Sequence, residues 1–326
     1  MPTVKEKIKN VIPQKLLKAC FKANSVLHYQ LLKIRKSRCN APFTSIYFEI
    51  DGRAHACCEN TTDSYGFYPF NSLNQMWFGR PMKDFREKIK QKNLAPGCKL
   101  CRFYLENKMP LKMKARYYDT LKKQKYPSQI EFRLANDCNL QCFMCDKISS
   151  SMVRKNVAKL APIKNPYDDE FVRQLGEYIP HLTRAHFVGG EPFAIDIYYK
   201  IWEQIIGMNP DCLIIVQTNA SLLNKRIKDL LERGRFSLNL SIDTLDKNLY
   251  EKIRVNANYE ITMRNIEYFI AYCKQKKYGT QHNCLPHATK LAHLALPGAI
   301  CEPSSGTYFF SHRVFSVARI VVWTIG

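Results

Sequence analysis

The chain lacks any long uninterrupted hydrophobic stretch. None of its 326 residues belongs to a run of the roughly 20 apolar residues that a membrane-spanning helix needs. The amino terminus also lacks the apolar core of a secretory signal, because Pro13 and several lysines interrupt it. The thirteen cysteines are an odd number, which does not suit a closed disulfide framework. These absences predict a reduced, cytoplasmic protein without a transmembrane segment, whose thiolates are available for metal.

Acidic residues are also scarce, with 28 Asp and Glu against 50 Lys and Arg. Such an excess of positive charge suits a nucleic-acid partner. The distribution of the positive charge favours a helix with a solvated basic face. Residues 1–38 hold ten Lys or Arg and the single acid Glu6, with apolar residues at helical spacing. We favour a docked basic helical arm here over contact with RNA, an anionic substrate or a membrane surface.

The composition divides the chain into five stretches. These are the basic arm 1–38, a cysteine-rich α+β module 39–108, a linker 109–128 with a helix over Leu111–Lys125, an alternating region 129–278, and a tail 279–326. The alternating region predicts strands over Ile130–Leu134, Ala185–Val188, Leu213–Gln217 and Phe236–Ile242. It predicts helices over Glu170–Tyr178, Tyr198–Ile206, Asn224–Arg233 and Ile261–Lys276. Four βα units indicate an α/β fold with a parallel sheet or barrel, whose reactive residues gather at the carboxyl ends of the strands.

Three cysteines follow the first of these strands at a C-x3-C-x2-C spacing: Cys138, Cys142 and Cys145. Three thiolates so placed can hold three irons of a 4Fe-4S cube and leave the fourth iron open to a ligand. The alternatives are plain buried thiols or a zinc site, for which Asp146 is the obvious local fourth ligand.

This motif resembles that of the radical S-adenosylmethionine (SAM) superfamily, in the branch with Asn-Leu after the first cysteine and Met144 before the last. Gly189, Gly190 and Glu191, followed by proline, resemble the family's GGEP motif at the end of the second strand. The resemblance implies that the glycines let the backbone approach the ligand and that Glu191 accepts hydrogen bonds from the methionine ammonium. By itself GGEP is equally compatible with a simple turn.

Three further segments resemble cofactor-binding positions of the same family. Thr218 and Asn219 resemble its TNG segment, although Ala220 replaces the glycine, and Ser241 with Asp243 resembles the segment that touches the ribose hydroxyls. The resemblance also implies that Arg254 pairs with the methionine carboxylate. Strand-end caps and a solvated helix charge are the alternatives.

The resemblance implies a partial (β/α)6 TIM-like barrel of about four clear βα units. It implies that a reduced 4Fe-4S cluster cleaves S-adenosyl-L-methionine to a 5'-deoxyadenosyl radical, which abstracts hydrogen from a substrate. An electron donor such as flavodoxin or ferredoxin would supply the electron. The family's habit favours a peptide or protein substrate. A catalytically inactive iron-sulfur binding protein and an RNA-modifying enzyme are the alternatives.

A second group of cysteines precedes the alternating region: Cys39, Cys57, Cys58, Cys98 and Cys101. Asp51-Gly52 between two apolar runs predicts a hairpin that brings Cys39 and Cys57 together. The module resembles the SPASM or twitch module, although that module usually follows the barrel. The resemblance implies a second 4Fe-4S cluster held by Cys39, Cys98, Cys101 and one of Cys57 and Cys58, and a structural zinc site is the alternative.

The remaining cysteines are expected to be buried thiols: Cys20, Cys212, Cys273, Cys284 and Cys301.

The tail departs from the alternating pattern, since Glu302 is its only acid and half of the histidines lie within it. Only Phe315–Val322 could form a late strand. Our hypothesis is that the tail is unrelated or frame-shifted sequence that replaces the last barrel units, which would leave an open sheet edge.

Overall fold

The structure is a computed structural model that describes residues 39–60, 62–91, 94–276 and 321–325. The predicted basic helical arm therefore lies outside the described residues. So do Cys20, Cys284 and Cys301 and most of the tail.

A seven-stranded sheet forms the centre of the described part, in the order β2-β1-β3-β5-β6-β7-β9. The strands are β1 Ser45–Phe48, β2 Ala54–His55, β3 Gln129–Phe132, β5 Arg184–Phe187, β6 Leu213–Thr218, β7 Phe236–Ile242 and β9 Val321–Ile325. Strands β1, β3, β5, β6 and β7 run parallel, whereas β2 and β9 pair antiparallel at the two edges. The four predicted strands of the alternating region are confirmed, with shifts of one or two residues at their ends.

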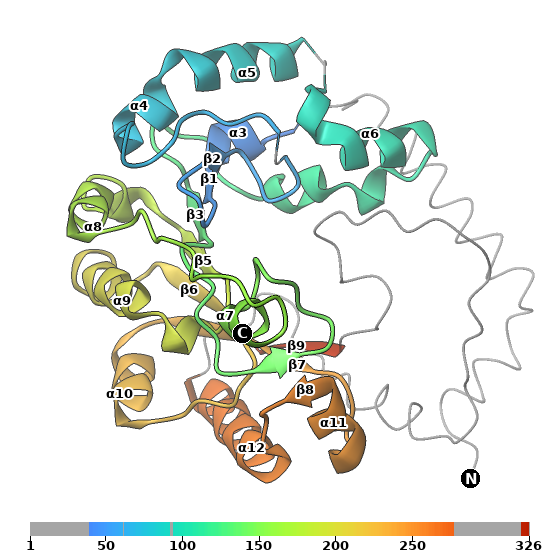
Figure 1. Cartoon of the computed structure of the whole chain (residues 1–326). Helices are drawn as coiled ribbons and strands as arrows, with labels where there is room; N and C mark the ends of the chain where they lie inside the picture. The colour runs from blue at the N-terminus through green and yellow to red at the C-terminus, as the bar shows by residue number, and fades with distance from the viewer. Residues whose placement is uncertain (1–38, 61, 92–93, 277–320, 326) are drawn as a thin grey trace, which may run out of the picture.

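The helices of the βα units lie along one side of this sheet (Figure 1). They are α8 Asp169–Leu175, α9 Asp196–Met208, α10 Lys225–Arg233 and α12 Tyr259–Lys276, and the shorter α11 Lys247–Ile253 follows β7. Polar side chains cap the start of four of them. For example, the Asp168 carboxylate accepts from Phe171 N (3.1 Å) and the Asn224 amide oxygen accepts from Ile227 N (3.0 Å). All four predicted helices are confirmed, and the fold is α/β with a parallel sheet.

Side chains that alternate along the strands explain why the helices pack on that side. Phe132, Phe187 and Val216 point toward the helices and are fully buried. Phe187 stacks on Phe132 with ring centres 4.8 Å apart and meets Trp202 of α9 edge-on at 5.4 Å. The opposite face carries many polar residues that are only half-buried, such as Gln217 on β6. One face of the sheet therefore forms the core, and the other stays available for function.

The amino-terminal module contributes strands to the same sheet. It contains α3 Ala41–Thr44, α4 Leu73–Phe78, α5 Arg80–Lys90 and α6 Lys99–Glu106 besides β1 and β2. The predicted hairpin is confirmed, because Asp51-Gly52 joins β1 to β2 and Gly52 takes a φ of 93°. Residue Ile46 of β1 pairs with Ile130 of β3, so the module and the alternating region share one sheet.

The predicted helix over Leu111–Lys125 is wrong. The segment forms two short 3-10 turns, Pro110–Lys112 and Lys114–Tyr118, separated by Met113 in an extended conformation with ψ of 132°. Met113, Ala115 and Tyr118 are buried, a spacing that no single helix face can present. Burial of these side chains against the sheet outweighs the helix propensity of the lysine-rich sequence.

The predicted late strand over Phe315–Val322 overlaps the structure only at its last two residues, because 315–320 lie outside the described residues. Strand β9 pairs antiparallel with β7, for example Trp323 with Leu240. None of the helices that the structure describes is long and apolar enough to cross a membrane.

The hydroxyl of Tyr198 on α9 joins the carboxyl ends of two strands. It donates to the carbonyl of Val188 (2.6 Å), lies 3.1 Å from the carbonyl of Phe132, and accepts from Leu134 N (2.9 Å). Tyr198 is fully buried. Because loops with candidate functional residues follow both strands, this hydroxyl fixes where the two loops begin.

We expect Tyr198→Phe to lower the free energy of unfolding by about 1–3 kcal/mol, because the buried Leu134 N–H loses its acceptor. Urea unfolding measures the change. Tyr118→Phe is the matched control, since the buried Tyr118 hydroxyl has no hydrogen-bond partner in the described part of the chain. Equal stability of Tyr198→Phe and the Tyr118→Phe control would contradict the bridging role.

Candidate functional site

The cysteine motif lies on the loop between β3 and α7 Ser151–Asn156. Within the loop, β4 Gln141–Cys142 pairs antiparallel with β8 Arg254–Val255, and Cys142 lies opposite Arg254. The backbone N of Phe143 also donates to the carbonyl of Ile253 (2.8 Å). A segment far along the chain therefore holds the middle cysteine in place. The sequence contains no obvious signal for this two-residue pairing.

The three thiols of the loop lie close together. The Cys142 thiol donates a hydrogen bond to Cys145, which raises the pKa of Cys142 and lowers that of Cys145. Burial raises the pKa of Cys138 to about 11, although Leu140 N lies 3.5 Å from its sulfur and favours the thiolate. The buried guanidinium of Arg254 favours the thiolates of Cys142 and Cys145. Three neighbouring sulfurs with a cation and a backbone donor suit an iron-sulfur cluster.

Gly189 and Gly190 pack against the start of the cysteine loop. A Cβ on Gly190 would lie 2.1 Å from the carbonyl oxygen of Asp137, and one on Gly189, whose φ is 121°, would lie 2.4 Å from that of Ala135. In return Glu191 N donates to the Asp137 carbonyl (2.7 Å). The glycines thus allow one loop to dock on the other, a role that the sequence did not reveal beside the expected approach to a ligand.

Glu191 is fully buried and joins the end of β5 to the end of β6. Its Oε1 accepts from Thr218 Oγ1 (2.7 Å) and Phe193 N (3.2 Å), and its Oε2 accepts from Asn219 N (2.7 Å). Burial raises its pKa to about 7 in spite of these donors. A carboxylate has about four acceptor positions, so one remains for a further donor.

Asn219 connects the end of β6 to the cysteine loop. Its Nδ2 donates to Asn139 Oδ1 (3.2 Å), and Asn139 Nδ2 donates to Ser221 Oγ (2.8 Å). Ala220, which stands where the family has glycine, takes a left-handed φ of 61°. The turn therefore keeps its shape without the glycine, at a cost of about 1 kcal/mol or more for the alanine Cβ. Asn139 and Ser221 are site residues that the sequence analysis missed.

The remaining candidate residues bind one another. Arg254 donates from Nε to Asp243 Oδ2 (2.6 Å) and from Nη2 to Oδ1 (3.3 Å), and both side chains are buried. Ser241 Oγ accepts from Gln217 Nε2 (2.6 Å). The structure thus brings together the strand-end residues that the sequence singled out, whereas the expected contacts of Asp243, Ser241 and Arg254 with a nucleotide remain predictions.

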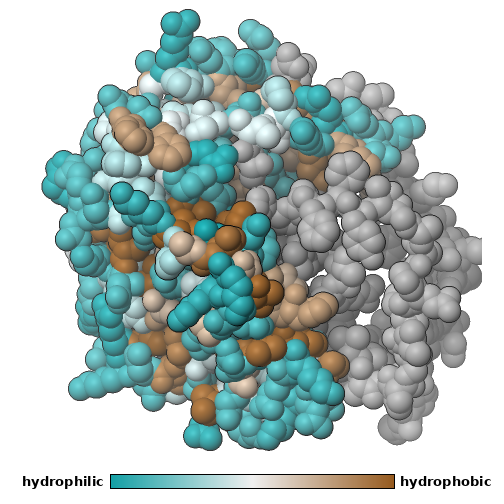
Figure 2. Space-filling model, viewed as in Figure 1, coloured by the Kyte–Doolittle hydropathy of each residue, from teal (hydrophilic) through white to brown (hydrophobic). Residues whose placement is uncertain are grey.

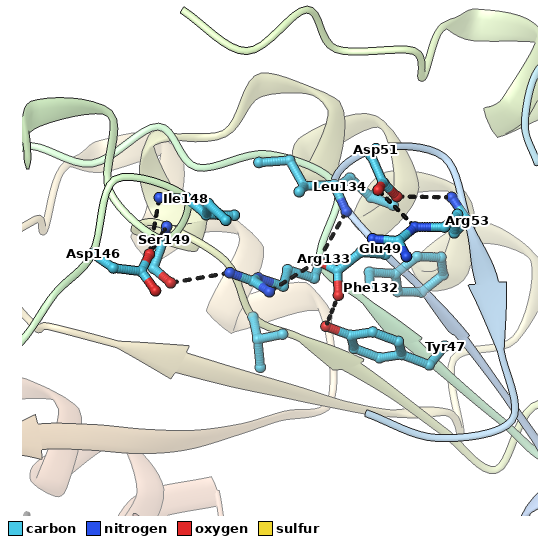
Figure 3. A network of polar contacts seen from close by, with 12 residues as sticks. Tyr47, Glu49, Asp51, Arg53, Phe132, Arg133, Leu134, Asp146, Ile148 and Ser149 are labelled. Carbon is cyan, nitrogen blue, oxygen red and sulfur yellow. Dashed lines mark hydrogen bonds and ion pairs between the residues drawn. The ribbon is translucent and has the colours of Figure 1, made fainter. Parts of the chain in front are cut away.

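Arg133 holds the far end of the cysteine loop (Figure 3). Its Nη1 donates to Glu49 Oε1 (2.9 Å) and its Nη2 donates to Ser149 Oγ (3.0 Å). Asp146, directly after Cys145, accepts from Ser149 N (2.7 Å) in the same network. The guanidinium is largely buried and links the amino-terminal module to the loop. Arg133 follows β3 directly, and polar residues at strand ends are the signal that could have identified it.

The second group of cysteines also gathers in the fold. Burial raises the pKa of Cys39 and of Cys98 to about 12. Cys98 and Cys101 lie near enough to Cys39 that their negative charge, when ionised, raises its pKa further. Cys39 and Cys98 raise the pKa of Cys57 in the same way. The neighbouring Cys58 instead accepts a hydrogen bond from Lys114. The predicted approach of Cys39 and Cys57 is thus confirmed.

Cys212 and Cys273, expected to be buried thiols, are both buried. Within the residues that the structure describes, no three Cys, His, Asp or Glu side chains converge as ligands of a single metal ion. The thiolate ligands of a cube each bind a separate iron, so they need not converge on one point.

The cysteine loop also reaches the surface. Phe143 is 89% exposed between two of the cysteines, and Val255 of β8 and Leu249 of α11 are 39% and 48% exposed. Figure 2 shows hydrophobic residues in the middle of the face that carries α7 and β8. The loop therefore combines one buried and two half-buried thiols with an apolar outer surface.

Part of the chain is similar to known proteins. Residues 132–287 match the sequence model of the Radical SAM superfamily. The chain is 29% identical over 140 residues to a probable GTP 3',8-cyclase of Methanococcus aeolicus, which covers 42% of this chain and 44% of the relative. It is 26% identical over 150 residues to the GTP 3',8-cyclase of Clostridium perfringens, which covers 44% of each chain. The chain thus spans less than half of the length of these relatives, and its similarity to the Radical SAM superfamily lies in residues 132–287.

Among solved structures, anSMEcpe with bound AdoMet is similar to this chain at 20% sequence identity. The TM-score is 0.36, and the match covers 44% of this chain and 41% of that chain.

We expect Arg133→Met to lower the free energy of unfolding by about 3–5 kcal/mol, because it leaves the Glu49 carboxylate buried without its cation. A double-mutant cycle with Glu49→Gln in urea measures the coupling. Arg173→Met is the control, since the exposed Arg173–Glu170 pair is expected to contribute little to stability. No coupling between Arg133 and Glu49 would contradict the link.

The raised pKa of Glu191 predicts a pH-dependent stability of the metal-free protein. The folded state binds the proton more tightly than the unfolded chain, whose glutamate titrates at its ordinary value of 4.5, so the free energy of unfolding falls as pH rises from 4.5 toward 7. The difference amounts to about 3 kcal/mol. Urea unfolding at about pH 5 and about pH 8 measures it, and Glu191→Gln should remove this part of the slope. An unchanged slope in the variant would contradict the assignment.

Proposed function

We propose that this chain is a radical SAM enzyme whose cluster is held by Cys138, Cys142 and Cys145. The observation that carries the proposal is the docking of the three-thiol loop on the GGEP loop, with Glu191 buried beneath it. A 4Fe-4S cluster with S-adenosyl-L-methionine supplies a reductive cleavage that yields a 5'-deoxyadenosyl radical, which takes hydrogen from the substrate.

The surrounding residues would bind and orient the nucleotide. The free acceptor position of Glu191 suits the methionine ammonium. Arg254 uses Nε and Nη2 for Asp243, which leaves Nη1 for the methionine carboxylate. Ser241 and Asp243 at the end of β7 would bind the ribose hydroxyls, and Thr218 and Asn219 would keep Glu191 in position.

We further propose that the amino-terminal module holds a second 4Fe-4S cluster, as a SPASM or twitch module does. Cys39, Cys57, Cys98 and Cys101 would be its ligands. Cys57 is preferred to Cys58 because the Cys58 sulfur is engaged by Lys114. A structural zinc ion is the alternative, but it would need the same four thiolates to converge on one ion, and they do not do so within the described residues.

The peptide substrate that family habit suggests receives no support from the relatives, which are named for GTP. An electron donor such as flavodoxin or ferredoxin would reduce the cluster, and a reducing cytoplasm would keep the thiolates free. A catalytically inactive iron-sulfur protein is the second candidate.

Iron and sulfide counts on protein purified without oxygen test both clusters. Cys142→Ala and Cys98→Ala should each lose about four irons per chain. Only Cys142→Ala should abolish the open-site cluster and, with it, release of 5'-deoxyadenosine after dithionite reduction. Cys212→Ala, which removes a buried thiol outside both groups, should behave as wild type.

Two results would contradict these proposals separately. Wild-type protein that holds a cluster at the open site but releases no 5'-deoxyadenosine would favour the inactive binding protein. Equal iron in Cys98→Ala and wild type would remove the second cluster and leave the first intact.

A further inference from the structure

The face of the sheet opposite the helices, here called the inner face, carries a row of side chains that lie side by side on neighbouring strands. The strand register places Tyr47 beside Glu131, Glu131 beside His186, and His186 beside Ile215. Ser237 of β7 completes the row next to Ile215. These residues alternate with the core residues, so their side chains lie on the face away from the helices. Polar residues at the centre of a row on such a face are unusual unless they bind something.

Three polar atoms at the centre of the row have no partner in the described part of the chain: Glu131 Oε2, His186 Nδ1 and His186 Nε2. Their side chains are only 5% and 16% exposed. Glu131 Oε1 lies 3.8 Å from His186 Nδ1, which is too far for a hydrogen bond. Asn239 lies two residues after Ser237 on β7, and its Oδ1 is also buried without a partner among the described residues. Buried polar atoms are nearly always hydrogen-bonded in native proteins, so this group is expected to have a partner beyond the described residues.

Two cations lie near the centre of the row. Lys114 interacts with the Glu131 carboxylate and, like Arg184, acts on the ring of His186. Burial lowers the pKa of His186 below 6.5, so its ring is neutral at neutral pH and offers one N–H donor and one acceptor. The row therefore offers acceptors at Glu131 and Asn239 and both functions at His186.

The position of the row connects it to the proposed reaction site. His186 is the next-to-last residue of β5 and precedes Gly189 by three residues, so the row lies about 10 Å from Gly189 along the chain. Gln217 and Ser241 lie on the same face, nearer the carboxyl ends of β6 and β7. A ligand bound at the row can therefore extend along this face toward the cysteine loop.

We propose that Glu131 and His186 form a recognition site for a planar group that presents N–H donors beside an acceptor, the chemistry of a purine edge or a carboxamide. This group would belong to the substrate, which rests on the proposed function. Binding at the row does not itself require cleavage of S-adenosylmethionine.

Calorimetric titration of the full chain, with its clusters intact, tests the site. The probes are guanosine and the neutral peptide acetyl-Gly-Gln-Gly-amide. Glu131→Gln replaces one acceptor oxygen with a donor and should weaken the recognised probe about tenfold to hundredfold. His186→Phe should weaken it as well while the protein stays folded, because the replaced nitrogens have no partner within the described chain. Glu170→Gln removes an exposed acid on the helix side of the sheet and should bind as wild type.

The two probes separate the sources of the ligand. If the two variants bind only guanosine more weakly, the ligand is a nucleobase. If they bind only the peptide more weakly, the ligand is a carboxamide. If neither probe binds at millimolar concentration, or both variants bind as Glu170→Gln does, the site is overturned. A crystal structure with only a water between Glu131 and His186 in the presence of both probes would overturn it too. A chain that releases 5'-deoxyadenosine but shows no binding at the row retains the proposed function and loses only this inference.

Discussion

The arrangement of the site depends on the buried carboxylate of Glu191. Its two oxygens accept hydrogen bonds from Thr218 and Asn219 at the end of β6, and its backbone N binds the carbonyl of Asp137 at the start of the cysteine loop. Burying a carboxylate is unfavourable unless such donors surround it, so the contact defines one geometry for three segments. Gly190 makes this geometry accessible, because any larger residue would collide with the Asp137 carbonyl.

Two further contacts hold the same loop from other directions. Strand β8 pairs with the backbone around Cys142, and Arg133 binds Ser149 beyond Cys145. Arg133 also binds Glu49, which directly follows β1. The amino-terminal module and the cysteine loop therefore share one buried cation. The loop is thus fixed at its start, middle and end, which keeps three thiols in place for a cluster without help from a fourth cysteine on the loop.

The elements of the βα units were predictable because each strand is a short apolar run followed by a loop and a helical pattern, as at Phe236–Ile242. The motif residues were predictable because they follow those runs directly. The helix over Leu111–Lys125 was not, since its outcome depends on burial of Met113 and Tyr118 against a sheet that the local sequence does not reveal.

Long-range partners were beyond the sequence for the same reason. The pairing of β4 with β8, the parallel addition of β1 to β3 and the link from Arg133 to Glu49 each join distant segments. Hydrophobic periodicity reports which face of an element is buried, and it carries no information about which distant residue lies opposite. The orphaned pair Glu131 and His186 likewise emerges only from the strand register.

The central claim is that three thiolates on the loop after β3 leave one iron free to bind the amino and carboxylate groups of a sulfonium nucleotide. Electron paramagnetic resonance of the reduced, oxygen-free protein tests it most directly, with and without added S-adenosyl-L-methionine, in wild type and in Cys98→Ala. The account predicts a reduced 4Fe-4S signal in both proteins whose g-values shift when the nucleotide is added. A signal that is absent, or that is identical with and without the nucleotide, would contradict it.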